Sequence, residues 1–219
     1  MKEMILESKI NVELSLVNIV EEYIYAIVKK YYKNGRLSKE HTTRYGLPHG
    51  EYRLYYPDGA LRYLGFFEDG KMEGWAQAWY NSGQMHSYQY YKNDKAEGWY
   101  FAYYENGQPN FQVQYVNGSK EGETKEWWPN GQLRAYGYYK NNLTHGDYHE
   151  WFDENGDTYV WMQFENGKQY KQQKYFQGKL VELIYLKDDK KHGKYKRWNA
   201  DGELVEDCIY ENGEVVQHI

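Results

Sequence analysis

The chain has 219 residues, of which 27 are Tyr, 8 Trp, 7 Phe and 21 Gly, and only 4 are Pro. Aromatic residues suit pleated strands and glycine suits the turns between them, so this composition predicts a β-protein, and its bulky side chains argue against disorder. The net charge of -5 disfavours a general nucleic-acid binder, and the single Cys208 excludes an intrachain disulfide framework.

The first 25 residues differ in pattern from the rest of the chain. Apolar residues from Ile10 to Leu16 alternate with polar ones, which indicates a strand. We interpret residues 1–25 as an N-terminal cap over an open sheet end. Residues 1–7 lack the apolar segment of a signal peptide, and no run in the chain approaches about 18 apolar residues. These features predict a cytoplasmic protein without a membrane span.

From residue 26 onwards the sequence repeats, mostly at steps of 24 residues. Gly50 is one of a series of anchor positions, and a second glycine follows most anchors by nine residues, as Gly59 does. A third position, four before each anchor from Gly50 onwards, holds only Gly, Asp or Asn, which best tolerate positive φ. The anchors define eight repeats, numbered 1 to 8, which begin near residues 26, 50, 74, 98, 122, 146, 171 and 193.

Each repeat is expected to hold two turns and two strands of about 7 to 9 residues. Segments such as Pro57-Asp58-Gly59 and Glu165-Asn166-Gly167 are strong hairpin signals. Because such short connections force antiparallel neighbours, the pattern predicts an all-β fold: an elongated antiparallel β-hairpin array in a single twisted meander sheet, comprising the cap (1–25) and a repeat domain (26–219). Irregular spacing is confined to about residues 153–178, with an insertion after Asp153 and Lys171 at an anchor.

Two aromatic rows follow the anchors, represented by Tyr55 and Tyr56. Adjacent strand residues point to opposite faces, so both faces should carry rings. If the nearby turns are two-residue loops, Leu61 and Phe67 join the face of Tyr56, which is then the core, and Arg134 joins the half-polar face of Tyr55. That second face is either a stacked ladder that stiffens the sheet or a recognition surface. A one-residue change in loop length would exchange the faces.

The sequence shows no convergent reactive set. His49, His145 and His192 each precede an anchor, where other repeats have Glu, so they share a turn position. His145 and His149 are four residues apart, about 13 Å along a strand, which is too far for one metal ion. We expect no metal, no cofactor and no enzymatic activity. Cys208 is expected to be a buried apolar residue, and the basic residues between 187 and 197 a solvated hairpin tip.

A family resemblance rests on two motifs. Gly-Glu-Tyr-Arg-Leu-Tyr-Tyr-Pro-Asp-Gly-Ala-Leu at residues 50–61 and Gly-Phe-Phe-Glu-Asp-Gly-Lys at 65–71 resemble the bacterial variant of the MORN repeat. The resemblance covers about residues 26–216. It implies a binding role, because many bacterial proteins built only of such repeats resemble antitoxins or immunity proteins, and others resemble scaffolds or lipid-contacting modules. Tyr-Tyr-Glu-Asn-Gly-Gln at 103–108 is also similar to exported choline- and glucan-binding repeats, which are shorter.

These observations predict a protein-binding repeat protein, most concretely an antitoxin or immunity protein that binds and neutralises a toxin or effector protein. Its acidic balance would steer a basic partner. The expected contact residues are the large aromatic residues of the central repeats: Trp75, Trp79, Trp99, Tyr103, Trp127 and Trp151. The alternatives are a carbohydrate- or choline-binding module and a structural scaffold that contacts lipid.

Overall fold

The computed structural model describes residues 24–219. The predicted strand within residues 10–16, and all but the end of the predicted cap, lie outside these residues. Residues 24–219 form 19 strands of an open antiparallel meander sheet, which confirms the predicted all-β hairpin fold. The chain divides between Lys95 and Ala96 into two compact units. We call residues 24–95 the N-terminal unit and residues 96–219 the C-terminal unit, and describe each by itself.

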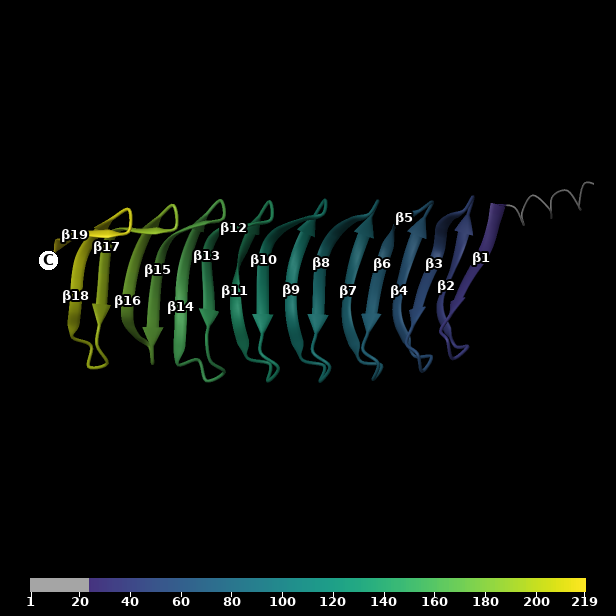
Figure 1. Ribbon diagram of the computed structural model, residues 1–219, viewed down its shortest axis with the longest axis horizontal. Helices are drawn as coiled ribbons and strands as arrows, with labels where there is room; N and C mark the ends of the chain where they lie inside the picture. Colours follow the sequence, from purple (N-terminus) through teal and green to yellow (C-terminus); the bar gives the residue numbers. More distant parts are fainter. Residues whose placement is uncertain (1–23) are drawn as a thin grey trace, which may run out of the picture. The chain divides into compact units, whose positions relative to one another are not determined.

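Within each unit, strands that follow one another in sequence pair antiparallel, except that β4 pairs with both β5 and β6 and β11 pairs with both β12 and β13 (Figure 1). The N-terminal unit contains β1 (Tyr25–Tyr31), β2 (Leu37–Arg44), β3 (Leu47–Tyr55), β4 (Leu61–Glu68), β5 (Lys71–Met72), β6 (Gly74–Trp79) and β7 (Met85–Lys92). Strand β8 (Lys95–Tyr103) begins at the division. The C-terminal unit continues with β9 (Pro109–Val116), β10 (Ser119–Trp127), β11 (Leu133–Lys140), β12 (Leu143–Thr144), β13 (Gly146–Trp151), β14 (Thr158–Glu165), β15 (Lys168–Phe176), β16 (Lys179–Lys187), β17 (Lys190–Trp198), β18 (Leu204–Glu211) and β19 (Glu214–His218).

Two kinds of hairpin turn alternate along the chain. The first is a two-residue type I′ turn, in which both residues have positive φ, as in Asn117 (52°) and Gly118 (83°). This conformation explains why its second position holds only Gly, Asp or Asn. The second kind is a three-residue loop, 57–59, in which Tyr56 N donates to Ala60 O at 2.8 Å and Gly59 N donates to Tyr56 O at 2.9 Å. It is a type I turn that ends in a glycine bulge with φ of 97° at Gly59.

The three-residue loops correct the predicted assignment of some side chains to faces. Leu61 pairs with Tyr55, and the same register places Leu133 opposite Trp127. The expectation that Leu61 joins Tyr56 is therefore wrong, because the extra loop residue shifts the register by one. Arg134, which was expected on the face of Tyr55, lies instead on the opposite face. Its guanidinium lies 5.1 Å from the Trp128 ring centroid and 3.4 Å from Glu126.

The anchor glycines mark bulges inside strands, which the sequence analysis did not foresee. Gly122 has φ of 85°, and the pairing of β10 with β9 shifts register between Lys120 and Thr124. In repeats 3 and 6 the same interruption separates β5 from β6 and β12 from β13. Positive φ suits glycine best, so the 24-residue anchor pattern reflects a recurrent kink in the strand.

The irregular segment 153–178 is resolved as two changes in loop length. Strands β13 and β14 pair without a bulge and are joined by the loop 153–157, across which Phe152 N donates to Thr158 O at 3.0 Å. The next turn at this end of the C-terminal unit has only two residues, Gln177 and Gly178, both with positive φ. The predicted insertion is therefore confirmed as a long loop, and it lies next to a short turn.

Each unit buries its side chains on one face of the sheet, which we call the buried face. In the C-terminal unit this face carries Val113 and Cys208, both fully buried, and Thr124, which is 2% exposed. Large and small residues alternate there: the Tyr148 ring covers Gly137, where an added Cβ would overlap Tyr148 Cδ2. A sheet without a second layer thus gains a core one side chain deep.

Recurrent hydrogen bonds join successive repeats. The hydroxyl of Tyr104 donates to Trp127 O at 2.8 Å, and in the N-terminal unit Tyr56 donates to Trp79 O at the same distance. At the opposite ends of the strands, Gly118 N donates to Ala96 O at 2.8 Å. Each repeat therefore satisfies backbone carbonyls of a neighbouring one, which fixes the spacing between hairpins.

Candidate functional site

The second face of each unit, which we call the open face, carries the six aromatic residues predicted as contacts. In the N-terminal unit Trp75 and Trp79 lie on alternate positions of β6. Trp75 is 50% exposed, and its ring meets the rings of Tyr88 and Tyr90 edge-on at 5.8 and 5.4 Å. This end of the unit presents an uncharged aromatic surface.

In the C-terminal unit the other four predicted residues lie on three different strands. Trp99 and Tyr103 are on β8, Trp127 on β10 and Trp151 on β13. Trp99 is 36% exposed and Trp127 and Trp151 are half-buried. Only Trp151 joins the ring cluster described next, with its centroid 5.3 Å from that of Tyr159. The predicted set therefore marks the open face of each unit rather than one compact cluster.

The open face of the C-terminal unit carries a stack of nearly parallel rings around His149. In the central row, Lys125, Tyr136, His149 and Trp161 pair in turn across β10, β11, β13 and β14. The His149 ring is nearly parallel to that of Tyr136, with centroids 4.7 Å apart, and to that of Tyr159 at 5.6 Å. The sequence alone did not indicate this role for His149, because most of its ring partners come from two other strands, β11 and β14.

A hydrogen bond and burial determine the protonation state of His149. His149 Nδ1 lies 2.7 Å from the Tyr159 hydroxyl. Burial lowers the pKa of His149 from its ordinary value, and the charge of Asp147 opposes that shift. A lowered pKa keeps the imidazole neutral, so it can stack against its neighbours without an unpaired charge.

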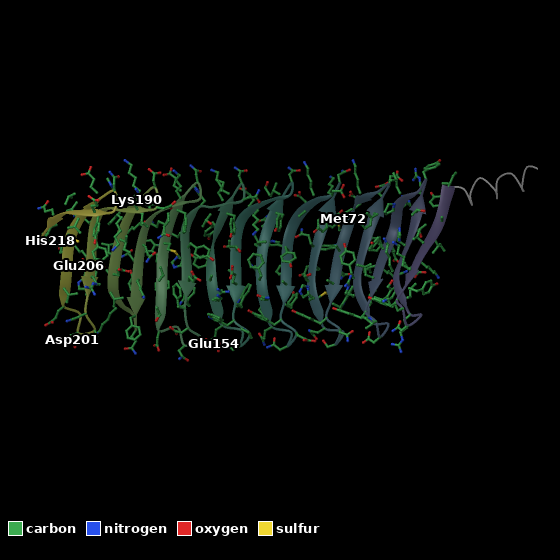
Figure 2. The ribbon with its side chains drawn as sticks, viewed as in Figure 1. Met72, Glu154, Lys190, Asp201, Glu206 and His218 are labelled. Atoms are coloured by element: carbon green, nitrogen blue, oxygen red, sulfur yellow. The ribbon has the colours of Figure 1, made fainter. Side chains whose placement is uncertain are left out.

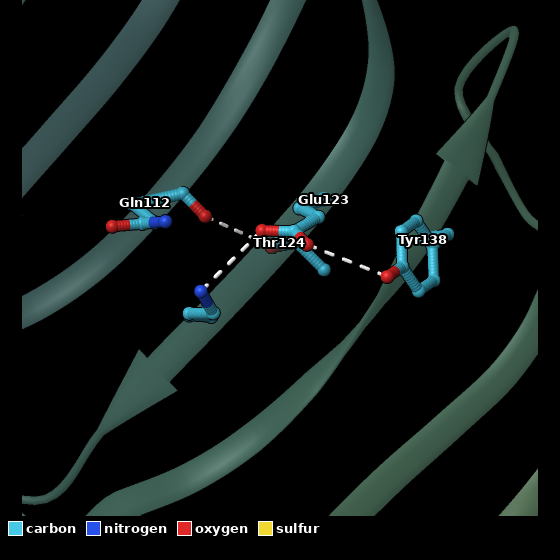
Figure 3. Close-up of polar contacts among 5 residues, drawn as sticks. Gln112, Glu123, Thr124 and Tyr138 are labelled. Atoms are coloured by element: carbon cyan, nitrogen blue, oxygen red, sulfur yellow. Dashed lines mark hydrogen bonds and ion pairs between the residues drawn. The ribbon is translucent and has the colours of Figure 1, made fainter.

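Carboxylates beside the stack are held by neighbouring side chains. Asp147 accepts hydrogen bonds from Trp161 Nε1 and Gln163 Nε2, both at 3.0 Å. Glu123 accepts from the Tyr138 hydroxyl at 3.4 Å and from Lys125 Nζ at 3.3 Å (Figure 3). The ammonium group of Lys171 lies 4.7 Å from the Trp161 ring centroid. The open face is therefore a preorganised mixture of rings and paired charges.

The two ends of the strands in the C-terminal unit differ in charge. Figure 2 shows Glu154 and Asp201 at one end and Lys190 at the other. The loops and turn at the first end carry six acidic residues and one basic residue: Glu105, Asp153, Glu154, Asp157, Asp201 and Glu203, with Lys179. The Asp153 carboxylate caps its own loop, because it accepts from Asp157 N and Thr158 N, both at 2.8 Å.

Other residues singled out in the sequence have structural roles. Cys208 is fully buried, as expected. Glu121 and its counterparts before the anchors accept from the first amide of a type I′ turn, as in Asn141 N to Glu121 Oε2 at 2.9 Å. In the basic segment, Lys196 pairs with Asp207 at 2.7 Å and Arg197 with Glu206 at 3.1 Å. Among residues 24–219, no three His, Cys, Asp or Glu side chains are grouped as metal ligands, and no helix there is long and apolar enough to cross a membrane.

Comparison with known families agrees with this geometry. Four segments match the MORN repeat variant. The matched residues are 48–69, 97–117, 120–141 and 191–212. Each match begins one or two residues before an anchor glycine, so the matches to the MORN repeat coincide with repeats 2, 4, 5 and 8. They support the MORN resemblance at these positions. No curated protein matches the chain.

Proposed function

We propose that this protein is a non-enzymatic, cytoplasmic MORN-repeat protein that binds another protein through its open face. The most concrete form of the proposal is an antitoxin or immunity protein, of the kind found in bacteria, that neutralises a toxin or effector by covering it. The observation that carries the proposal is the open face of the C-terminal unit, where rings and paired charges are held rigid across five strands.

The arrangement of this face favours a protein partner. Tyr and Trp are common at the centres of protein interfaces because they bury much area at little entropic cost. Trp99 and Tyr138 are 36% and 39% exposed, so they offer such area without rearrangement of the sheet. The imidazole and the carboxylate at the centre of the face are already engaged: His149 with Tyr159, and Asp147 with Trp161 and Gln163. This engagement supports a binding role over a catalytic one.

The same geometry weighs against the two alternatives. A sugar-binding platform needs a free ring face, yet at the centre of the stack the faces of Tyr136 and His149 lie against one another. A scaffold on anionic lipid would gain from a basic surface, whereas the chain has a net charge of -5. Neither alternative is supported by a specific contact of the described residues.

The test is co-expression with the product of the adjacent gene, followed by co-purification and a growth assay. We expect a stable complex and relief of any toxicity of that product. Trp99→Ala or Trp127→Ala should weaken the complex at least about tenfold if either residue is a hot spot. Phe152→Ala is the matched control, because Phe152 is 56% exposed and follows Trp151 on the opposite side of its strand. Absence of any complex would contradict the proposal.

A further inference from the structure

A shallow pocket of about 380 Å³ lies in the C-terminal unit where the sequence repeat is irregular. It is lined by Trp151, Gly156, Asp157, Tyr159, Tyr175 and Gly178. Its outer walls are the long loop 153–157 and the short turn at Gln177 and Gly178, which are joined by a hydrogen bond of 2.7 Å from Gln177 N to Asp157 O. The regular hairpins have three-residue loops at this end, so the pocket results from the change in loop length.

The inner wall of the pocket is a row of three rings. Trp151, Tyr159 and Tyr175 pair in turn across β13, β14 and β15. Neighbouring centroids are 5.3 and 5.2 Å apart, and the ring planes are inclined by 32° and 34°. All three rings are half-buried. The wall is therefore a fixed row of tilted rings and not a box of mutually perpendicular rings.

The rim of the pocket is acidic. Asp157 is exposed, and within residues 24–219 its carboxylate makes no hydrogen bond or ion pair, because only its backbone atoms are bonded. Asp153 and Glu154 lie in the same loop. A negative loop beside an aromatic surface attracts a cation to it.

The geometry points to a binding site for a guanidinium group, supplied by an arginine of the protein partner. A guanidinium is planar, stacks on aromatic rings and forms paired hydrogen bonds with a carboxylate such as that of Asp157. A quaternary ammonium is spherical and is held by rings that surround it, which the row of Trp151, Tyr159 and Tyr175 does not do. The assignment rests on the proposed function only for the origin of the guanidinium.

The test uses the full chain, labelled with ¹⁵N, and N-acetyl-arginine N-methylamide as the probe. We expect saturable shifts of the Trp151 side-chain and the Gly156 and Gly178 backbone signals. The neutral analogue N-acetyl-citrulline N-methylamide has nearly the same shape and should bind at least about twofold more weakly. Tetramethylammonium should bind more weakly than the arginine amide. Equal binding of citrulline, or tighter binding of tetramethylammonium, would overturn the assignment.

Variants locate the site. Asp157→Asn removes the rim charge and should weaken arginine binding by about two- to fivefold, the range for an exposed ion pair. Glu105→Gln is the matched control, because it removes the same charge from a regular loop at the same end and should leave binding unchanged. An equal loss in both variants overturns the site. Because no partner protein enters this experiment, its failure leaves the complex predicted above intact, and a missing complex leaves the pocket assignment intact.

Discussion

The imidazole of His149 lies against the ring of Tyr136, with centroids 4.7 Å apart and planes inclined by 16°. The two residues pair across β11 and β13, which are separated in sequence by the short strand β12. Tyr159 and Trp161 on β14 extend the same stack. The stack makes the stability of this part of the sheet depend on the protonation state of one side chain.

The first prediction concerns pH. In the folded chain, burial lowers the pKa of His149 from its ordinary value of 6.5. As the pH falls through about 6.5, the unfolded chain binds the proton first, so the free energy of unfolding decreases until the folded pKa is reached. Urea unfolding at pH 7.5 and 5.5 should show this loss. His149→Phe keeps a flat ring without titration and should lose less stability over the same range.

A second histidine, His41, should account for the pH dependence of stability that remains in the His149→Phe variant. Burial lowers its pKa as well, helped by Lys39, so the His149→Phe variant should keep some pH dependence. An identical loss of stability in the wild type and in His149→Phe would contradict the prediction.

A second prediction tests the contact between Gly137 and Tyr148. Gly137→Ala should reduce the free energy of unfolding by about 1–3 kcal/mol, because the added methyl group overlaps the Tyr148 ring. Alanine would otherwise be favoured over glycine in a strand, so the sign of the effect is diagnostic. Gly137→Ala should cost less stability in a Tyr148→Leu background than in the wild-type chain, because the smaller side chain leaves room for the methyl group. Additive effects in urea unfolding would show that the two residues do not compete for space.

A third prediction tests the hydrogen bond between repeats 4 and 5. Tyr104→Phe removes the hydroxyl that donates to Trp127 O and should reduce stability by about 0.5–1.5 kcal/mol. Tyr100→Phe, four residues earlier in β8, is the control, since the structure shows no hydrogen bond from the Tyr100 hydroxyl to residues 96–219. Thermal unfolding followed by circular dichroism compares the two. A larger effect at position 100 would be inconsistent with this role of Tyr104.

A fourth prediction tests the type I′ turn at Gly118, whose φ is 83°. Gly118→Val should reduce stability by about 1–3 kcal/mol, because a β-branched residue is strained at positive φ. Gly118→Asn should be nearly neutral, since Asn142 occupies the equivalent position with φ of 67°. Chemical unfolding measures the stability of both variants. An equal loss of stability in the two would contradict the view that backbone conformation selects the residue at position 118.

The turns could be predicted from the sequence because positive φ restricts the residue type so strongly. Gly118, Asn142 and Asp189 share one position and one conformation. The register next to the three-residue loops could not be predicted, because Pro57-Asp58-Gly59 is compatible with loops of two or three residues. That single ambiguity misplaced Leu61 and Arg134.

The candidate site was less accessible to sequence reasoning. The aromatic row that includes Trp127 and Trp151 is visible as a periodic pattern, and these residues do lie on the open face. The stack around His149 depends on the register of several strands at once, including β14 after the irregular loop. The pocket beside Asp157 arises from two loops in different repeats, and neither of them contains a recognisable binding motif.

The bonds between repeats have a consequence for how such a chain can change in length. Gly118 N reaches Ala96 O and Asn142 N reaches Lys120 O, so in both cases the donor lies 22 residues after its acceptor. A tandem duplication of one whole repeat would therefore recreate these donors and acceptors at its junctions, whereas a partial duplication would leave them unpaired. Copy number is thus a variable that such a gene can alter by recombination between its own similar segments, without any redesign of the fold.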